Sequence, residues 1–251
     1  MTSGEPHTLH LVTCVTISCT WKPSQALNLQ VTTPPLAITV LNRYDLLRLQ
    51  LESLAASTVK PPRILILDNG GRFQEAIQEG MMPLWERTAV MGTDEERALA
   101  RSWNHAVRWG LTNHEAVIIA NDDITWQKTA YRTLAEGIRY GEPDMASTEN
   151  VGGFVCFALT RKIIDKIGYF DERFFPAYFE DEDYKYRMKL AGLEPRIVPG
   201  CFIDHVESAS LKAMSDDQKK LFGLHFQRNF ALYRQKWGGV VGNETLMEPA
   251  I

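Results

Sequence analysis

Short apolar runs alternate with helical repeats along most of the chain. Residues 36–41 and 64–67 are apolar runs of the length found in buried strands. Between them, the leucines of residues 47–54 fall on one face of a helix. A strand, a helix, a second strand and then a Gly-rich turn at 68–71 predict a parallel β-α-β unit.

The alternation continues downstream, although residues 72–96 show no clear pattern. The remaining predicted strands are 116–120, 151–159, 196–198 and 201–203, and the remaining predicted helices are 97–109, 124–141, 161–167 and 180–191. Aromatic residues recur at helical spacing from Phe222 to Trp237 and predict a last helix that packs on the domain. Strands that alternate with helices in this way are typical of an α/β fold.

The composition is that of a globular protein. The chain has 251 residues and a net charge of −4, with 45% hydrophobic and 23% charged residues. No basic run gives the footprint of nucleic-acid binding, and no apolar run reaches the length that spans a bilayer. The four cysteines are Cys14, Cys19, Cys156 and Cys201, none of them in a Cys-x-x-Cys pair. We therefore expect reduced thiols in a cytoplasmic protein without a transmembrane segment.

The chain has one clear change of character, near its start. The first 33 residues are rich in Thr and Ser, contain one weak strand candidate at 9–17, and lack the basic start and apolar core of a signal peptide. We expect residues 1–33 to be a poorly ordered appendage and 34–240 to form one domain. Residues 241–251 are then a C-terminal tail.

Two adjacent acids follow the predicted strand 116–120. Asn121, Asp122 and Asp123 come at its carboxyl end. Acids in such a place are costly unless they are exposed or bind a ligand. A hard divalent cation, with carboxylate and phosphate oxygens as ligands, suits them.

Other polar residues are candidates for binding a phosphorylated ligand. Asp68 ends the predicted strand 64–67, at the edge where open α/β sheets bind ligands. It can accept hydrogen bonds from a base or ribose, or it can close an Asx turn, because Asp-Asn-Gly is common turn sequence. Arg97 and Arg101, four apart on a predicted helix, suit phosphates, and a solvated helix face explains them equally well. Gly153, before an apolar run, marks close approach of a ligand or of backbone.

Four consecutive acids, residues 180–183, follow an aromatic run and begin a helix that Gly192 and Pro195 end. Acids at a helix start are often only favourable partners of the helix dipole. An aromatic wall, however, lowers the local dielectric and raises the basicity of a carboxylate, as a general base requires. Asp183 has Arg187 four residues later as a surface partner, and Glu182 is expected to face solvent.

Taken in order, these motifs resemble the family 2 glycosyltransferases of the GT-A fold over about residues 36–239. The motifs are 39–43, 68–71, 101–104, 121–123, 168–175, 180–183 with Arg187, His205, and the ending 233–239. The resemblance is nearest to a bacterial and phage branch with rhamnosyltransferase-like sequences. It implies a single Rossmann-like mixed sheet flanked by helices.

The resemblance also implies roles for residues. Asp68 contacts the nucleobase of a nucleotide sugar, and Asp181 is the catalytic base, with Glu180 as its rival. Asp123, helped by Asp122 and His205, binds Mn²⁺ or Mg²⁺ against the donor diphosphate. The other donor-binding candidates are Thr39, Asn42, Arg43, Asn69, Arg97, Arg101, Asn104, Asp122 and Gly153. Asn121 stands where the family more commonly has an acid, which changes the set of carboxylate ligands.

The function that follows is metal-assisted glycosyl transfer to a hydroxyl, with inversion because a single base acts without a covalent intermediate. The donor is a UDP-, dTDP- or GDP-linked sugar. The acceptor is left open among a glycan, a lipid-linked sugar, a protein and a modified DNA base.

Two alternatives remain. A sugar-phosphate nucleotidyltransferase needs a Gly-rich phosphate loop after its first strand, where this chain has Asn42-Arg43-Tyr44. A non-catalytic nucleotide-sugar-binding module is disfavoured by the intact acids Asp123 and Asp181.

Overall fold

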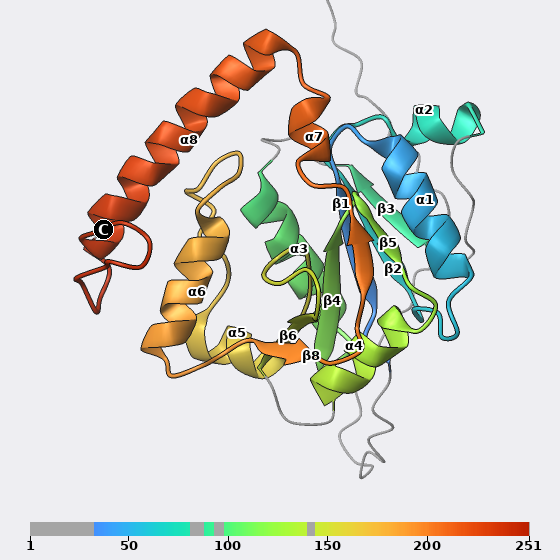
Figure 1. Cartoon of the computed structure of the whole chain (residues 1–251), viewed down its shortest axis with the longest axis horizontal. Helices are drawn as coiled ribbons and strands as arrows, with labels where there is room; N and C mark the ends of the chain where they lie inside the picture. Colours follow the sequence, from blue (N-terminus) through green and yellow to red (C-terminus); the bar gives the residue numbers. More distant parts are fainter. Residues whose placement is uncertain (1–32, 81–87, 93–97, 140–143, 251) are drawn as a thin grey trace, which may run out of the picture. The chain divides into compact units, whose positions relative to one another are not determined.

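A mixed sheet of seven strands forms the centre of the fold (Figure 1). The structure, a computed structural model, describes residues 33–80, 88–92, 98–139 and 144–250. From one edge of the sheet to the other, the strands are β3 (Thr88–Gly92), β2 (Ile64–Asp68), β1 (Leu36–Val40), β4 (Ala116–Asn121), β7 (Cys156–Thr160), β6 (Met145–Thr148) and β8 (Arg196–Val198). The first four strands are parallel, and β7 is antiparallel to both of its neighbours. The predicted α/β class with a mixed sheet is confirmed.

The register of the parallel strands brings their carboxyl ends to one edge. Thr39 on β1 lies opposite Asn121 on β4, and Val40 lies opposite Asp68 on β2. The residues that follow β1, β2 and β4 therefore leave the sheet side by side. Along the chain, about 50 residues separate the end of β2 from the end of β4.

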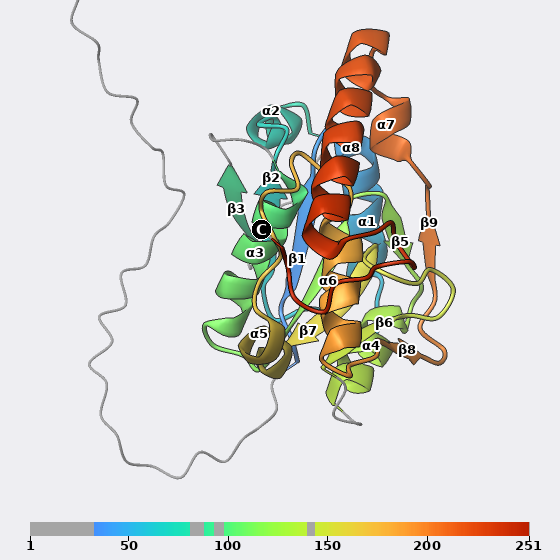
Figure 2. The same cartoon turned by 90° about the vertical axis from the view of Figure 1, so that its left-hand side faces the viewer.

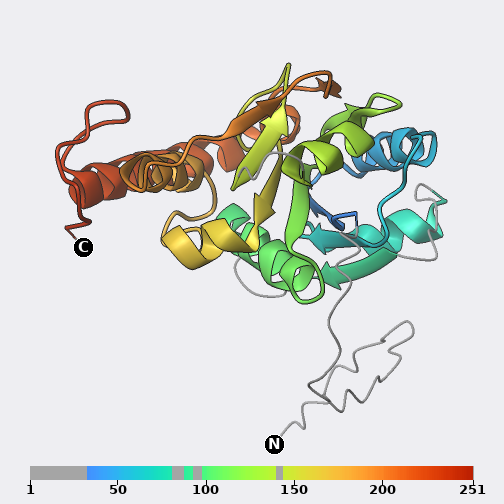
Figure 3. The same cartoon turned by 90° about the horizontal axis from the view of Figure 1, so that it is seen from below.

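Two layers of helices cover the sheet, because alternate residues of each strand face opposite sides. Ile38 packs with α1 (Tyr44–Ala55) and α4 (Ala130–Arg139). Its neighbour Ala37 packs on the other side, with α3, α5 and α6. These three helices are α3 (Leu99–Leu111), α5 (Arg161–Ile167) and α6 (Glu180–Leu190). Figure 3 shows the sheet between the two layers. The short α2 (Phe73–Gln78) follows the turn after β2.

A second sheet of two short strands lies outside the main one and was not predicted. β5 (Ile124–Trp126) pairs antiparallel with β9 (Ile203–His205), so that Ile124 lies opposite His205. The sequence predicted a helix from residue 124 and a strand at 201–203 instead. Pairing across about 80 residues leaves no local pattern, which is why the sequence did not reveal it.

The last helix, α8 (Asp216–Trp237), runs beside α6 and follows the short α7 (Ala209–Lys212) (Figure 2). It begins in a capping box of Ser215 and Gln218 and ends at Gly238. Its second half packs Tyr233 and Trp237 against aromatic residues of the 174–186 segment. The helix packing predicted for the C-terminal aromatic residues is confirmed.

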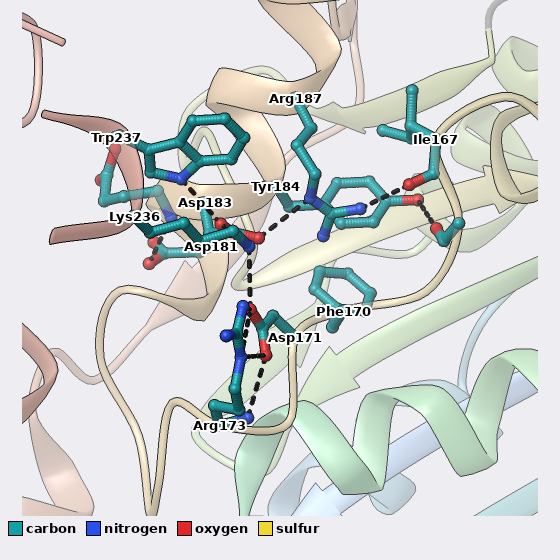
Figure 4. A network of polar contacts seen from close by, with 12 residues as sticks. Ile167, Phe170, Asp171, Arg173, Asp181, Asp183, Tyr184, Arg187, Lys236 and Trp237 are labelled. Carbon is teal, nitrogen blue, oxygen red and sulfur yellow. Dashed lines mark hydrogen bonds and ion pairs between the residues drawn. The ribbon is translucent and has the colours of Figure 1, made fainter. Parts of the chain in front are cut away.

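A buried network of charges joins α8 to α6 (Figure 4). Asp183 is fully buried and accepts hydrogen bonds from Arg187 Nε at 2.9 Å and Trp237 Nε1 at 2.8 Å. Lys236 Nζ lies 2.5 Å from Asp183 Oδ1 and donates to Asp171 Oδ2 at 2.8 Å. Although burial opposes the shift, hydrogen bonds from Arg173 and Lys236 lower the pKa of Asp171. The predicted pairing of Asp183 with Arg187 is confirmed, but its predicted place at the surface is wrong, since the carboxylate is in the interior.

Some expectations fall outside the described residues: the strand candidate at 9–17, Cys14, Cys19 and Arg97. The division of the chain after residues 33 and 240 stays a prediction. Of the helices that the structure describes, none is both long enough and apolar enough to cross a membrane.

Candidate active site

A cavity of about 450 Å³ opens where the carboxyl ends of the strands meet the start of α6. Five parts of the chain line it: the ends of β1, β2 and β4, the first residues of α3 (Leu99 and Trp103), the loop before β7, the segment from 176 to α6, and the segment from His205 into α8. The polar residues among its lining are Thr39, Asn69, Asn121, Asp122, Asp123, Tyr178, Glu180, Asp181, Lys185, His205, Ser208 and Ser210. Both acidic clusters singled out in the sequence thus line one cavity.

Asp122 is buried at the strand edge of the cavity. Its Oδ2 accepts a hydrogen bond of 3.4 Å from the backbone N–H of Leu41. Burial, and next the charge of Asp123, raise the pKa of Asp122 to about 7. At neutral pH the Asp122 carboxyl, beside Asp123, is therefore only partly ionised unless a cation binds.

Asp123 faces His205 across the small sheet. His205 Nε2 lies 3.4 Å from Asp123 Oδ2, and the pairing of β5 with β9 holds the two residues together, because the N–H of Val206 donates to the carbonyl of Asp123 at 2.9 Å. Asp123 Oδ1 is buried without a hydrogen-bond partner. Burial raises the pKa of Asp123, while His205 opposes that rise.

These residues suit a divalent cation that takes part of its ligands from a substrate. A carboxylate and an imidazole are common metal ligands, and the buried Asp123 Oδ1 lacks a partner that a cation supplies. Within the described ranges, no group of three or more His, Cys, Asp or Glu side chains is arranged to hold a metal. A cation at Asp123 and His205 would therefore complete its shell with phosphate oxygens or water, as Mg²⁺ commonly does.

Two acids at the start of α6 line the opposite wall. Glu180 is 3% exposed, and its Oε2 is buried without a hydrogen-bond partner. Burial, and next the charge of Asp181, raise the pKa of Glu180 to about 8. Glu180 is therefore mostly protonated at pH 7 and can donate a hydrogen bond into the cavity.

Asp181 differs from Glu180 by having a cation close by. Lys185 Nζ lies 3.7 Å from Asp181 Oδ2. Burial raises the pKa of Asp181, and the charge of Lys185 opposes that rise. Asp181 Oδ1 accepts a hydrogen bond from the N–H of Glu182 at 2.9 Å, which fixes its orientation.

The other two acids of this helix do not line the cavity. Glu182 pairs with Lys185 at 2.9 Å, with about a third of its side chain exposed, which agrees with the prediction that it faces solvent. Asp183 belongs to the buried network between α6 and α8.

Asp68 is occupied by the turn that follows β2. One carboxylate oxygen accepts from the N–H of Gly71 at 2.9 Å and from the Tyr44 hydroxyl, and the other accepts from the N–H of Phe73 at 3.0 Å. Gly70 passes so close to Leu41 that a Cβ atom would lie 2.0 Å from its carbonyl oxygen. Of the two interpretations left open for Asp68, the structure displays the turn, while a nucleobase contact stays a prediction. The next residue, Asn69, is the one that lines the cavity.

The other residues predicted to bind the donor fall into two groups, those that line the cavity and those that do not. Thr39, Asn69, Asp122 and Gly153 line the cavity, and Gly153 has a φ of +78°, which favours glycine. Asn42 and Arg43 do not line it. Asn42 Nδ2 donates to the carbonyl of Ser210 at 3.1 Å, and Arg43 pairs with Asp45. Arg43 also donates to the carbonyl of Ala209 at 3.5 Å, so both residues contact backbone of the segment that lines the cavity.

Asn104 and Arg101 on α3 were also predicted to bind the donor, but their side chains have other partners. Arg97, a third such residue, lies outside the described residues. The Asn104 side chain accepts from the N–H of Phe170 and donates to its carbonyl, both at 2.9 Å. Arg101 Nε donates to Glu172 at 3.3 Å. Both side chains therefore hold the loop before α6 and do not line the cavity, because they lie on the face of α3 that packs against that loop.

Several lining residues were not predicted from the sequence. Lys185 had a detectable signal, since it follows Asp181 by four residues, the spacing of neighbours on a helix. Tyr178 had one as well, since it belongs to the aromatic run that precedes the four acids. Phe222 and the residues of α7 had none, because α7 and α8 reach the cavity only through tertiary packing.

Comparison with known proteins gives a family match over more than half of the chain. Residues 36–202 match the model described as Glycosyl transferase family 2. Over 65 residues the chain is 42% identical to a galactofuranosyl glycosyltransferase of Leishmania donovani. That stretch covers 26% of this chain and 15% of the Leishmania protein.

Two solved structures share the fold at low sequence identity. One is the mannosyltransferase PcManGT from Pyrobaculum calidifontis, in complex with GDP-Man and Mn²⁺, with a TM-score of 0.54 at 15% identity over 78% of this chain and 62% of that chain. The other is GalNAc-T7 with UDP, GalNAc and Mn²⁺, with a TM-score of 0.58 at 13% identity over 71% of this chain and 44% of that chain. The chain thus spans less than two thirds of the length of each of these relatives.

The turn role of Asp68 can be tested by stability. We expect Asp68→Ala to lower the free energy of unfolding by roughly 2–4 kcal/mol, because buried N–H donors lose their acceptor. Urea denaturation measures the change. The control Asp45→Ala, which removes a solvent-exposed carboxylate, should stay within about 1 kcal/mol of wild type. An Asp68→Ala protein of normal stability that has lost affinity for nucleotides would instead favour the nucleobase contact.

Proposed function

This chain belongs to glycosyl transferase family 2 and has the GT-A fold, and we propose that it moves a sugar from a nucleotide-diphosphate sugar to an acceptor hydroxyl with inversion at the anomeric carbon. One observation carries the proposal: two separate acidic clusters line the same cavity. Glycosyl transfer to an alcohol needs positive charge near the leaving diphosphate and a base near the hydroxyl. The clusters at the strand ends and on α6 match these two needs.

The metal end of the proposed site consists of Asp123 and His205, with Asp122 beside them. They would hold Mn²⁺ or Mg²⁺, which when bound stabilises negative charge on the leaving diphosphate. The supporting observations are the partnerless Oδ1 of Asp123 and the 3.4 Å separation from His205. PcManGT and GalNAc-T7 were both solved with Mn²⁺.

The donor lies, in this proposal, along the ends of the parallel strands. Thr39 and Asn69 contact the nucleoside, since both line the cavity at the strand edge. Gly153 lets backbone approach the donor closely because it carries no side chain. The nucleotide is UDP, dTDP or GDP.

The base is Asp181. Lys185, at 3.7 Å, favours the ionised form of Asp181, so this carboxylate can accept the proton of the acceptor hydroxyl. Glu180, whose pKa burial raises to about 8, is mostly protonated at pH 7 and is the poorer base there. Glu180 would instead donate a hydrogen bond to an oxygen of the substrate.

Inversion follows from the use of a single base. Without a covalent sugar–enzyme intermediate, the acceptor oxygen forms its bond to the anomeric carbon on the face opposite the departing diphosphate. The proton of the hydroxyl goes to Asp181. The transition state resembles an oxocarbenium ion, as in glycoside hydrolysis.

Two finer assignments are part of the proposal. The rhamnosyltransferase-like bacterial and phage branch rests on the sequence ending at 233–239. A cytoplasmic site of action is supported by Cys156 and Cys201, which are free and buried thiols.

The metal assignment predicts the behaviour of Asp123→Ala. We expect this variant to lose Mn²⁺-dependent affinity for UDP, GDP or dTDP by roughly tenfold or more, about 1.4 kcal/mol. Isothermal titration with and without Mn²⁺ measures the loss. The control is Asp204→Ala, which removes an exposed acid next to His205 on β9. Undiminished Mn²⁺-dependent binding by Asp123→Ala would refute the metal assignment.

The base assignment predicts different effects for two neighbouring acids. We expect Asp181→Asn to lower kcat by roughly two to four orders of magnitude, the range for losing a general base, with little change in donor affinity. Release of the nucleoside diphosphate from a panel of UDP-, GDP- and dTDP-sugars measures turnover. Asp165→Asn, which makes the same change at an exposed acid of α5 outside the cavity, is the matched control.

Two outcomes would change this account. Near-normal turnover by Asp181→Asn, together with an inactive Glu180→Gln, would move the base to Glu180. Tight nucleotide-sugar binding by the wild type without any turnover would indicate a binding module.

A further inference from the structure

The turn that leads into α6 has an unusual backbone. Tyr178 and Phe179 both have positive φ angles, 79° and 73°, immediately before Glu180. A bulky residue in this region costs of order 1–3 kcal/mol and persists only where the surroundings enforce it. Such outliers gather at functional sites.

Helix α8 supplies the contacts that hold the turn. The fully buried Asn229 donates from Nδ2 to the carbonyls of Ala177 at 2.9 Å and Tyr178 at 3.2 Å. Phe179 packs with its ring centroid 5.7 Å from those of Phe230 and Tyr233. All three of these partners lie on α8, outside the residues 36–202 that match the family model. The family match therefore says nothing about what this arrangement does.

The turn places an aromatic ring on the cavity wall. Tyr178 lines the cavity and is 37% exposed, with its ring centroid 5.2 Å from that of Phe222, which lines the cavity from α8. Leu211 and Met214 continue this apolar wall. We call these four residues the apolar wall.

A hydrogen-bonding group lies in the same part of the cavity. Glu180 follows the turn directly, and its buried Oε2 lacks a partner within the protein. A buried carboxyl oxygen without a hydrogen-bond partner indicates that a ligand group supplies the missing partner. The cavity next to the base therefore offers an apolar wall together with a polar acid.

We propose that the space between the apolar wall and Glu180 is the acceptor subsite, and that it takes a neutral sugar ring, so that the acceptor is a glycoside. This inference rests on the proposed glycosyltransferase function. A pyranose has a C–H face that suits the rings of Tyr178 and Phe222, and hydroxyl groups at its edge that suit Glu180 and Asp181. An alkyl chain would leave the Glu180 oxygen without a partner, at an energetic cost. An anionic acceptor would meet the acids of the cavity.

The test uses methyl glycosides of glucose, galactose, mannose, rhamnose and N-acetylglucosamine as probes, with hexanol and methyl glucuronide as the contrasting alkyl and anionic probes. Saturation-transfer NMR detects binding without any donor. We expect at least one neutral glycoside to bind, and Tyr178→Ala to weaken its binding by roughly tenfold, the order expected for loss of one aromatic contact. Phe222→Ala should weaken it as well, and Tyr178→Phe should keep it.

The matched control is Tyr169→Ala. Tyr169 is also a surface tyrosine, 39% exposed, but it lies under Arg108 and does not line the cavity. This variant should bind the glycoside like the wild type. The donor KM of each variant, measured by nucleotide-sugar hydrolysis, shows whether the rest of the site is intact.

The outcomes separate this inference from the proposed function. Failure of the wild type to hydrolyse any UDP-, GDP- or dTDP-sugar would overturn the function. Donor hydrolysis without binding of any neutral glycoside would leave the function standing and overturn the acceptor subsite. Glycoside binding that is the same in Tyr178→Ala and the wild type, or preferential binding of hexanol or methyl glucuronide, would overturn it too.

Discussion

The buried carboxylate of Asp183 is the interaction on which the acidic wall of the cavity depends. It accepts hydrogen bonds from Arg187 and Trp237 and an ion pair from Lys236, and it is fully buried. Removing one partner of such a pair costs about 3–5 kcal/mol, because a charge is left in the interior without compensation. The contact fixes α6 against α8. The first turn of α6, which carries the two acids of the cavity, is held by the same packing.

The site thus has two origins within the fold. The parallel strands deliver Thr39, Asn69 and Asp123 to one edge through their register, as open α/β sheets do for ligands in general. The opposite wall comes from α6, which α8 and the strained turn before it hold in place. A cavity built from two independently supported walls can place a cation near one and a base near the other.

Local sequence patterns predicted the strands and helix ends that depend on interactions between residues close together in the chain. The buried strands at 36–41, 64–67 and 116–120 and the helix stop at Gly192 follow from apolar runs and turn residues, and the structure has these elements with shifts of one or two residues. The family resemblance implied a role for Asp123 and another for Asp181, and the structure places both residues in the lining of one cavity.

What the sequence could not show depends on contacts between distant residues. The pairing of β5 with β9, which brings His205 to Asp123, joins segments about 80 residues apart. The local sequence around Asn104 does not distinguish a side chain that faces a ligand from one that faces a neighbouring loop. Tertiary packing places it against the loop. Asp183 likewise has the spacing of a surface pair, and the helix that buries it comes more than 30 residues later.

The central claim is that one cavity holds a cation at Asp123 and His205, opposite the acids of α6. The most direct measurement is a crystal structure with Mn²⁺ and a nucleoside diphosphate, using anomalous scattering at the manganese edge. The account predicts an anomalous peak bonded to Asp123 and to the diphosphate, with His205 beside it. Nucleotide bound in the cavity with the manganese peak at another site, or with none, would contradict the account.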